Sequence, residues 1–257
     1  MTQASAHEYW LEPLATDFVV GDKLKADIRN GQDLIGNALP FQPDVLSRAG
    51  LISDNTRQSL SGQLGDYPAF QIPVEEPGLQ LLLLETRQRE LRYPDYKDFN
   101  TFLDYHGLQT IAERHLAREL PQQDIIEHYY RYCKALIFVE ETAGSPDKPL
   151  QQNPAALQAQ GQRLELIADS NPLLSDSLRL QLQFEGNALA GRQVELFHRD
   201  RNDTVTRTLA NTDDEGFVTF SIPDKGDYLA NSVKLVEPLK TSAHWETLWA
   251  SLYFQKS

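Results

Sequence analysis

The alternation of apolar and polar positions predicts strands at several places in the first half of the chain. Apolar side chains alternate with polar ones from Phe18 to Ile28, which is typical of a strand with one buried face. The run from Leu79 to Leu84 is short and almost continuously apolar, which favours a strand covered on both faces. Residues 135–139 are wholly apolar and predict one more short strand.

Before this last strand, residues 95–132 predict a helical insertion. Asp98 is a suitable N-cap for a first helix, and Gly107 ends that helix. Apolar side chains then recur three and four residues apart, which predicts a second helix that ends before Pro121. Residues 122–132 predict a third helix.

A stretch rich in glycine, serine and proline at 143–154 has the composition of a linker. We therefore expect two domains, 7–142 and 155–257. The second domain contains strictly alternating segments such as Leu178 to Phe184, separated by turns rich in glycine and aspartate. Short strands at this spacing are typical of an antiparallel β-sandwich. The predicted fold class is mainly β, with two immunoglobulin-like β-sandwich domains, the first carrying the short helical insertion.

Composition and charge exclude several classes of protein. The 257 residues are 40% hydrophobic and 24% charged, which is typical of a globular chain. No run of roughly 18 apolar residues is present, so we expect no membrane-spanning helix. The net charge of −13 makes nucleic acid and anionic lipid poor partners, because like charges repel. Cys133 is the one cysteine, which excludes a disulfide within the chain and a thiolate zinc site.

The first residues bear on localisation. Residues 4–6, Ala-Ser-Ala, match the small-x-small pattern that signal peptidase accepts. The charged and apolar regions of a signal peptide are missing from this chain. Two alternatives follow: an exported protein whose sequence starts close to its cleavage site, or a cytoplasmic protein with a polar start.

No motif of a known catalytic mechanism is present, since the chain has no GxGxxG, GxxxxGK[ST], HExxH or GxSxG. Adjacent acids occur at 75–76, 140–141 and 213–214. Neighbours in a strand point to opposite faces, so such pairs are poorly placed to flank a glycosidic bond. We therefore predict no catalytic residue.

Histidines carry the remaining chemistry, because a neutral imidazole is a common metal ligand. If the chain is cleaved before His7, the α-amine and ring Nδ1 of His7 would chelate one divalent ion, and a third nitrogen ligand would complete a site that prefers copper. The alternative is that His7 is an ordinary strand residue. His106 has an alternative as a helix C-cap, and His128 has one as a packed side chain.

Aromatic residues offer a second kind of site. Trp10, Trp245, Trp249 and Tyr253 would line a sugar- or peptide-binding face if they were exposed. If the first domain covers them, they are part of the core between the domains.

Six segments, taken in order, resemble those of one protein family: His7–Pro13, Phe99–Leu108, Tyr130–Leu136, Leu164–Pro172, Gly186–Gly216 and Trp245–Phe254. The chain is similar to an exported bacterial family of unknown function that is associated with nickel uptake, the NikM-like periplasmic proteins. The resemblance implies a signal peptide, a periplasmic address and two β-rich domains. It also implies that the second domain is similar to transthyretin-like or carboxypeptidase-regulatory-like sandwiches.

The resemblance also bears on the metal site. His7 matches the near-terminal histidine of the family, whereas residues 233–235, Val-Lys-Leu, stand where a histidine is expected. His244 stands where relatives often carry an acid, so it is the first companion that we expect for His7, followed by His106 and His128. The hypothesis is a periplasmic protein that binds a divalent transition metal (Ni, Cu, Co or Zn) as an accessory to a membrane transporter. The alternative is a metal-free β-sandwich module that binds glycan or protein in the cell envelope.

Overall fold

The strands assemble into three sheets in the computed structural model, which describes residues 7–144, 153–238 and 242–257. The ten-stranded sheet contains, in spatial order, β15 (Val205–Asn211), β14 (Gln193–Arg199), β17 (Gly226–Val236), β18 (Trp245–Lys256), β10 (Gln123–Glu140), β8 (Gly78–Thr86), β5 (Leu46–Ile52) and β6 (Arg57–Ser59), with β2 (Asp17–Val19) and β9 (Arg89–Asp95) also paired to β10. β10 and β18 run parallel over ten residue pairs, from Glu127 opposite Trp245 to Leu136 opposite Phe254.

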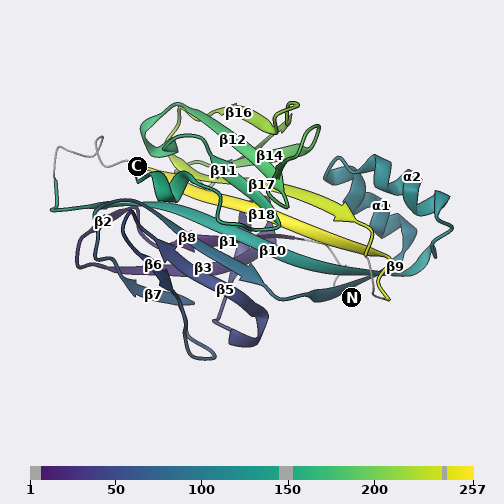
Figure 1. Cartoon of the computed structure of the whole chain (residues 1–257), viewed down its shortest axis with the longest axis horizontal. Helices are drawn as coiled ribbons and strands as arrows, with labels where there is room; N and C mark the ends of the chain where they lie inside the picture. The colour runs from purple at the N-terminus through teal and green to yellow at the C-terminus, as the bar shows by residue number, and fades with distance from the viewer. Residues whose placement is uncertain (1–6, 145–152, 239–241) are drawn as a thin grey trace.

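Two four-stranded sheets cover opposite faces of this large sheet (Figure 1). One contains β1 (Glu8–Pro13), β3 (Lys23–Gln32), β4 (Ile35–Leu39) and β7 (Phe70–Pro73). The other contains β11 (Leu164–Ala168), β12 (Ser177–Phe184), β13 (Asn187–Ala188) and β16 (Phe217–Ser221). Short 3₁₀ turns lie at η1 (Pro43–Val45), η2 (Pro154–Leu157) and η3 (Pro172–Leu174).

Alternation along the central strands separates the two cores. Even-numbered residues of β10 and β18, such as Leu136 and Leu252, pack toward β11 and β12. Odd-numbered residues such as Ile137 and Tyr253 pack toward β1 and β3, because successive side chains of a strand point to opposite faces. The mainly β, sandwich-like class predicted from the sequence is confirmed, with the sheets stacked as layers.

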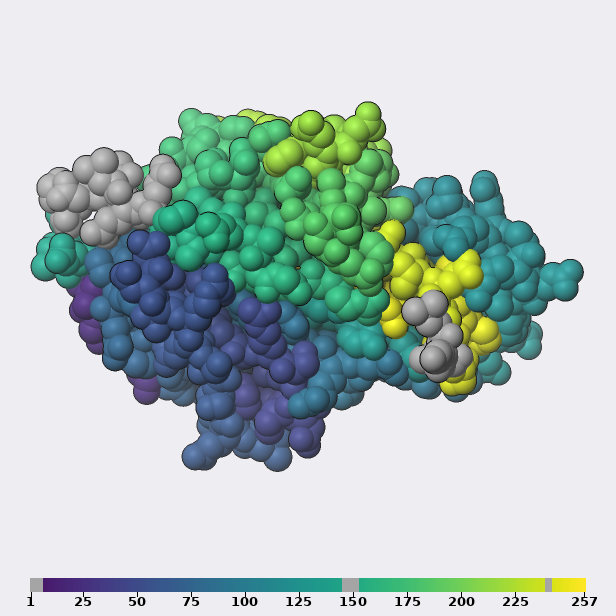
Figure 2. Space-filling view, viewed as in Figure 1, coloured from purple at the N-terminus to yellow at the C-terminus, as the bar shows by residue number. Residues whose placement is uncertain are grey.

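The helical insertion consists of α1 (Tyr96–Tyr105) and α2 (Gln109–Ala117), which form a lobe at one end of the molecule (Figure 2). Gly107 has a φ of 65° and ends α1, as predicted. The N-cap is Asp95 and not Asp98, because the Asp95 carboxylate accepts a hydrogen bond of 2.9 Å from the Asp98 N–H. No helix of the described ranges is long and apolar enough to span a membrane.

Two predicted elements are wrong. The segment 18–28 is not one strand, because Gly21, with a φ of 95°, turns the chain between β2 and β3. The predicted helix at 122–132 is the first half of β10. Two of its charged residues, Glu127 and Arg131, are buried inside the protein. Leu79–Leu84 is a strand buried on both faces, as predicted.

The predicted domain boundary falls inside the ten-stranded sheet. Six of its strands, β2, β5, β6, β8, β9 and β10, precede the linker predicted at 143–154, and β14, β15, β17 and β18 follow it. Residues 145–152 of that linker lie outside the described residues. One apolar cluster joins Leu81 and Leu136 to Leu248. The division into two domains stays a prediction, and the shared sheet is a physical reason for both halves to unfold together.

Candidate functional site

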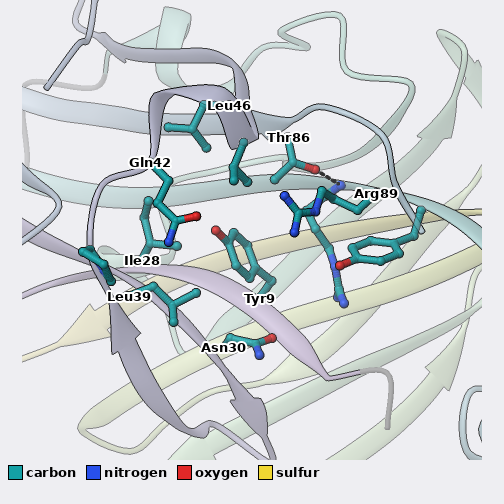
Figure 3. A pocket seen from close by; sticks show the side chains of 12 residues that line it. Tyr9, Ile28, Asn30, Leu39, Gln42, Leu46, Thr86 and Arg89 are labelled. Atoms are coloured by element: carbon teal, nitrogen blue, oxygen red, sulfur yellow. Dashed lines mark hydrogen bonds between the residues drawn. The ribbon is translucent and has the colours of Figure 1, made fainter. Parts of the chain in front are cut away.

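A pocket of about 170 Å³ opens between the small sheet that contains β1 and the part of the large sheet where β8 is followed by β9 (Figure 3). We call it the Arg131 pocket. Its lining residues come from both sheets: Tyr9, Ile28, Asn30, Leu39, Pro40, Gln42, Val45, Leu46, Thr86, Arg89, Tyr129 and Arg131.

The pocket lies where β10 changes its neighbour. β10 is in register with β9 as far as Tyr129 and with β8 from Ile137 onward. In between, the Arg131 N–H donates a hydrogen bond of 3.0 Å to the side-chain oxygen of Thr86, at the end of β8. The turn from β8 into β9 therefore leaves room beside Arg131.

Arg131 is a buried cation that interacts electrostatically with the Glu127 carboxyl on the same strand but forms no ion pair with it. It is 7% exposed, and its guanidinium carbon lies 4.1 Å from the ring centroid of Trp249 and 5.1 Å from that of Tyr129. One of its terminal nitrogens donates to the His7 carbonyl, whereas Nε is buried without a partner. Burial lowers the pKa of Arg131, although an arginine stays protonated in proteins. Within the described residues it forms no ion pair.

The charge around the pocket differs from that of the whole chain. The chain has 37 acidic against 24 basic residues, yet among the described residues two arginines and no Asp or Glu line the pocket. Arg89 is exposed and lies opposite Tyr129 in the β9–β10 register. Glu127 lies further along the same face of β10, but burial raises the pKa of its carboxyl to about 7, so it carries only part of a charge near neutral pH. The pocket is therefore locally positive.

Tyr9 forms a wall of the pocket and is fixed by the large sheet. Its carbonyl accepts hydrogen bonds from Ser251 Oγ at 2.8 Å and from Cys133 Sγ at 3.2 Å. Burial raises the pKa of the Cys133 thiol to about 12, so it remains a donor. Burial also raises the pKa of the Tyr9 phenol well above its usual range, and its hydroxyl is a neutral hydrogen-bonding group.

The four histidines predicted as metal ligands occupy separate environments. The ring Nδ1 of His106 lies 2.8 Å from Glu195 Oε1, inside the core. His244 accepts a hydrogen bond of 2.8 Å at Nδ1 from the Ile126 N–H, and burial lowers the pKa of its ring.

His128 is buried, with Nε2 3.6 Å from Glu90 Oε2. His7 lies just before β1, its carbonyl accepts a hydrogen bond from Arg131, and burial lowers the pKa of its ring. In the part of the chain that the structure describes, no three side chains of His, Cys, Asp or Glu are grouped as a metal ion requires. The metal site stays a prediction, and the predicted cleavage site at 4–6 lies outside the described residues.

The aromatic side chains that offered a sugar- or peptide-binding face are buried. Trp10, Trp245, Trp249 and Tyr253 are all at most 2% exposed. They belong to the apolar clusters on the face of the large sheet covered by β1, β3 and the helices. The core alternative is confirmed for these four residues.

Tyr9, Arg89 and Arg131 were not predicted as site residues. Residues 122–132 show no alternation of apolar and polar positions that would have marked Arg131 as a buried strand residue.

Comparisons with solved structures find weak likenesses. A tetra-tandem repeat in the extending region of a large adhesion protein matches with 9% identity and a TM-score of 0.23, covering 96% of this chain and 49% of that one, so the chain spans about half its length. The D0–D1 domain of intimin matches with 8% identity and a TM-score of 0.22, covering 96% and 97%. Scores this low support no inference about fold or function.

A comparison with curated proteins finds no match. The model of one family, described as a domain of unknown function (DUF4198), matches residues 4–233. The chain therefore belongs to this family of domains of unknown function.

Proposed function

We propose that this protein binds a small anionic ligand in the Arg131 pocket. The observation that supports it is the buried Arg131 guanidinium, which has an unpartnered Nε and lies in a pocket lined by no acid. A buried charge is costly unless it is paired, and an anion would supply the pair.

The other polar groups of the pocket suit the same ligand. Arg89 at the rim adds a second positive charge, and the hydroxyls of Tyr9 and Tyr129 add neutral donors. Opposite unit charges 4 Å apart attract by about 4 kcal/mol at an effective dielectric constant of about 20. A guanidinium also presents its donors in a planar fork that matches a carboxylate.

This proposal develops the metal-free alternative of the sequence analysis, with a small molecule as ligand. The cell-envelope location stays a prediction. Metal binding by His7, His244, His106 and His128 also stays a prediction, and no contact among the described residues favours it.

The test is thermal unfolding of the whole chain with increasing acetate, phosphate or sulfate, at constant ionic strength. A ligand at 100 times its Kd stabilises a protein by about 2.7 kcal/mol, which raises Tm by roughly 5–10 °C at this chain length. We expect the rise in the native protein and its loss in Arg131→Met.

The matched control is Arg92→Met. Arg92 is an exposed arginine of β9 that does not line the pocket, and its removal changes the net charge equally. It should respond to anions as the native protein does. A native protein that no anion stabilises, or an Arg131→Met variant that responds fully, would refute the proposal.

A further inference from the structure

We infer that the ligand is an amphipathic carboxylate with a short apolar chain, bound with its carboxylate at Arg131 and its chain against Ile28, Leu39 and Leu46. This inference rests on the proposed function, and it names the class of ligand for the same pocket.

The pocket combines charge with apolar surface. In Figure 3, Ile28, Leu39 and Leu46 lie to the left of the Tyr9 ring, together with the amide side chain of Gln42, and Arg89 lies to the right. Asn30 also lines the pocket. Pro40 and Val45 also contribute apolar surface to the lining. An inorganic anion would use only the charged side and leave this apolar surface in water.

One terminal nitrogen of Arg131 is free for a carboxylate. Nη1 already donates to the His7 carbonyl. Nε has no partner among the described residues, but it is fully buried, so a ligand in the pocket does not reach it. Nη2 donates to no residue that the structure describes, so it is the N–H group from which a carboxylate oxygen would accept.

The volume limits the size of the ligand. The cavity of about 170 Å³ is smaller than the roughly 300–1,000 Å³ of pockets that hold drug-sized ligands. It therefore suits a carboxylate with a chain of only a few carbons. A neutral sugar would not supply the anion that pairs with the buried Arg131 charge.

The experiment is isothermal titration of the full chain with acetate, propionate, butyrate, pentanoate and hexanoate, and with phosphate and glucose. Each buried methylene contributes about 0.8 kcal/mol, so affinity should rise about fourfold per carbon. We expect this rise up to butyrate or pentanoate and little gain beyond, with phosphate weaker than butyrate and no binding of glucose.

The variant that tests the apolar side is Leu39→Ala, because Leu39 is only partly buried and its loss spares the core. It should bind acetate as the native protein does and show a smaller gain per carbon. The matched control is Leu209→Ala, an exposed leucine of β15 that does not line the pocket, which should leave the series unchanged. Circular dichroism checks that both variants are folded.

The outcomes separate the two proposals. If acetate and phosphate bind at Arg131 but affinity does not rise with chain length, or if Leu39→Ala leaves the gain per carbon unchanged, the carboxylate inference is refuted and the proposed function stands. If phosphate binds more tightly than butyrate, the inference is refuted in the same way. If no anion binds the native protein, both are refuted.

Discussion

Removing the charge of Lys134 tests how the segment after the linker is held to the large sheet. Lys134 on β10 is 2% exposed, and Glu165 on β11 is 1% exposed. The Lys134 ammonium donates to Glu165 Oε1 at 2.5 Å and to the Leu166 carbonyl at 3.1 Å. The Glu165 carboxylate also accepts from three backbone N–H groups, those of residues 160, 161 and 162. Both charged groups of the pair therefore have further hydrogen-bond partners within the protein.

In Lys134→Met the side chain keeps its length, but the Glu165 carboxylate stays buried without its cation. Removing one partner of a buried ion pair costs about 3–5 kcal/mol. We expect the lower end, because three backbone donors still stabilise the carboxylate. A loss of about 3 kcal/mol lowers Tm by roughly 6–12 °C at this chain length. The double variant Lys134→Met/Glu165→Gln should lose less, since it buries no unpaired charge.

Urea unfolding, followed by the fluorescence of the three buried tryptophans, measures these differences at constant m-value. The control is Arg92→Met, because Arg92 and Glu90 form an ion pair in which both side chains are 51% exposed, and such pairs contribute about 0–1 kcal/mol. A loss below about 1 kcal/mol in Lys134→Met, or a double variant less stable than the single one, would contradict the reasoning.

The remaining predictions concern pH and the two halves of the chain. Burial and the Glu195 charge raise the pKa of Glu8 from 4.5 to about 8, so unfolding releases a proton between these values and stability falls as pH rises through them. Glu8→Gln should match the native Tm near pH 4 and exceed it near pH 8, and parallel Tm curves for the two proteins would contradict this. Residues 155–257 expressed alone should unfold without a cooperative transition in calorimetry, because β18 loses ten pairs with β10; a sharp transition would instead support two independent domains.

The sequence predicted correctly those elements that depend on residues close together in the chain. The apolar run at Leu79–Leu84 and the glycine at 107 depend on neighbours in sequence, and both were interpreted correctly. The strand predicted at 135–139 is the second half of β10. The first half was not predicted as a strand, because the burial of its polar residues is decided by distant partners. Lys134 is buried because Glu165 meets it across the layers, and no periodicity within β10 carries that information.

The Arg131 pocket was out of reach for the same reason. Tyr9 and Cys133 are 124 residues apart in sequence, yet they are hydrogen-bonded once β1 crosses the large sheet. Residues that form a pocket wall in this way are far apart in the sequence, so no motif of fixed spacing indicates the pocket. The histidines were chosen from the sequence only because imidazole binds metals. In the structure, His106, His244 and His128 each contact a different residue.

β10 carries two buried cations, Lys134 and Arg131, which differ in the partners that the protein gives to their charged groups. Lys134 and Arg131 point to opposite faces of one strand, three residues apart. Lys134 meets a carboxylate and a carbonyl, so its burial is compensated within the chain. Arg131 meets one carbonyl and three aromatic rings, and its Nε stays unpartnered. Aromatic contacts stabilise a guanidinium by about 0.5–2 kcal/mol each, but they supply no acceptor for its remaining N–H groups. This contrast is why we propose ligand binding on the Arg131 face of the strand and a structural role for Lys134 on the other face.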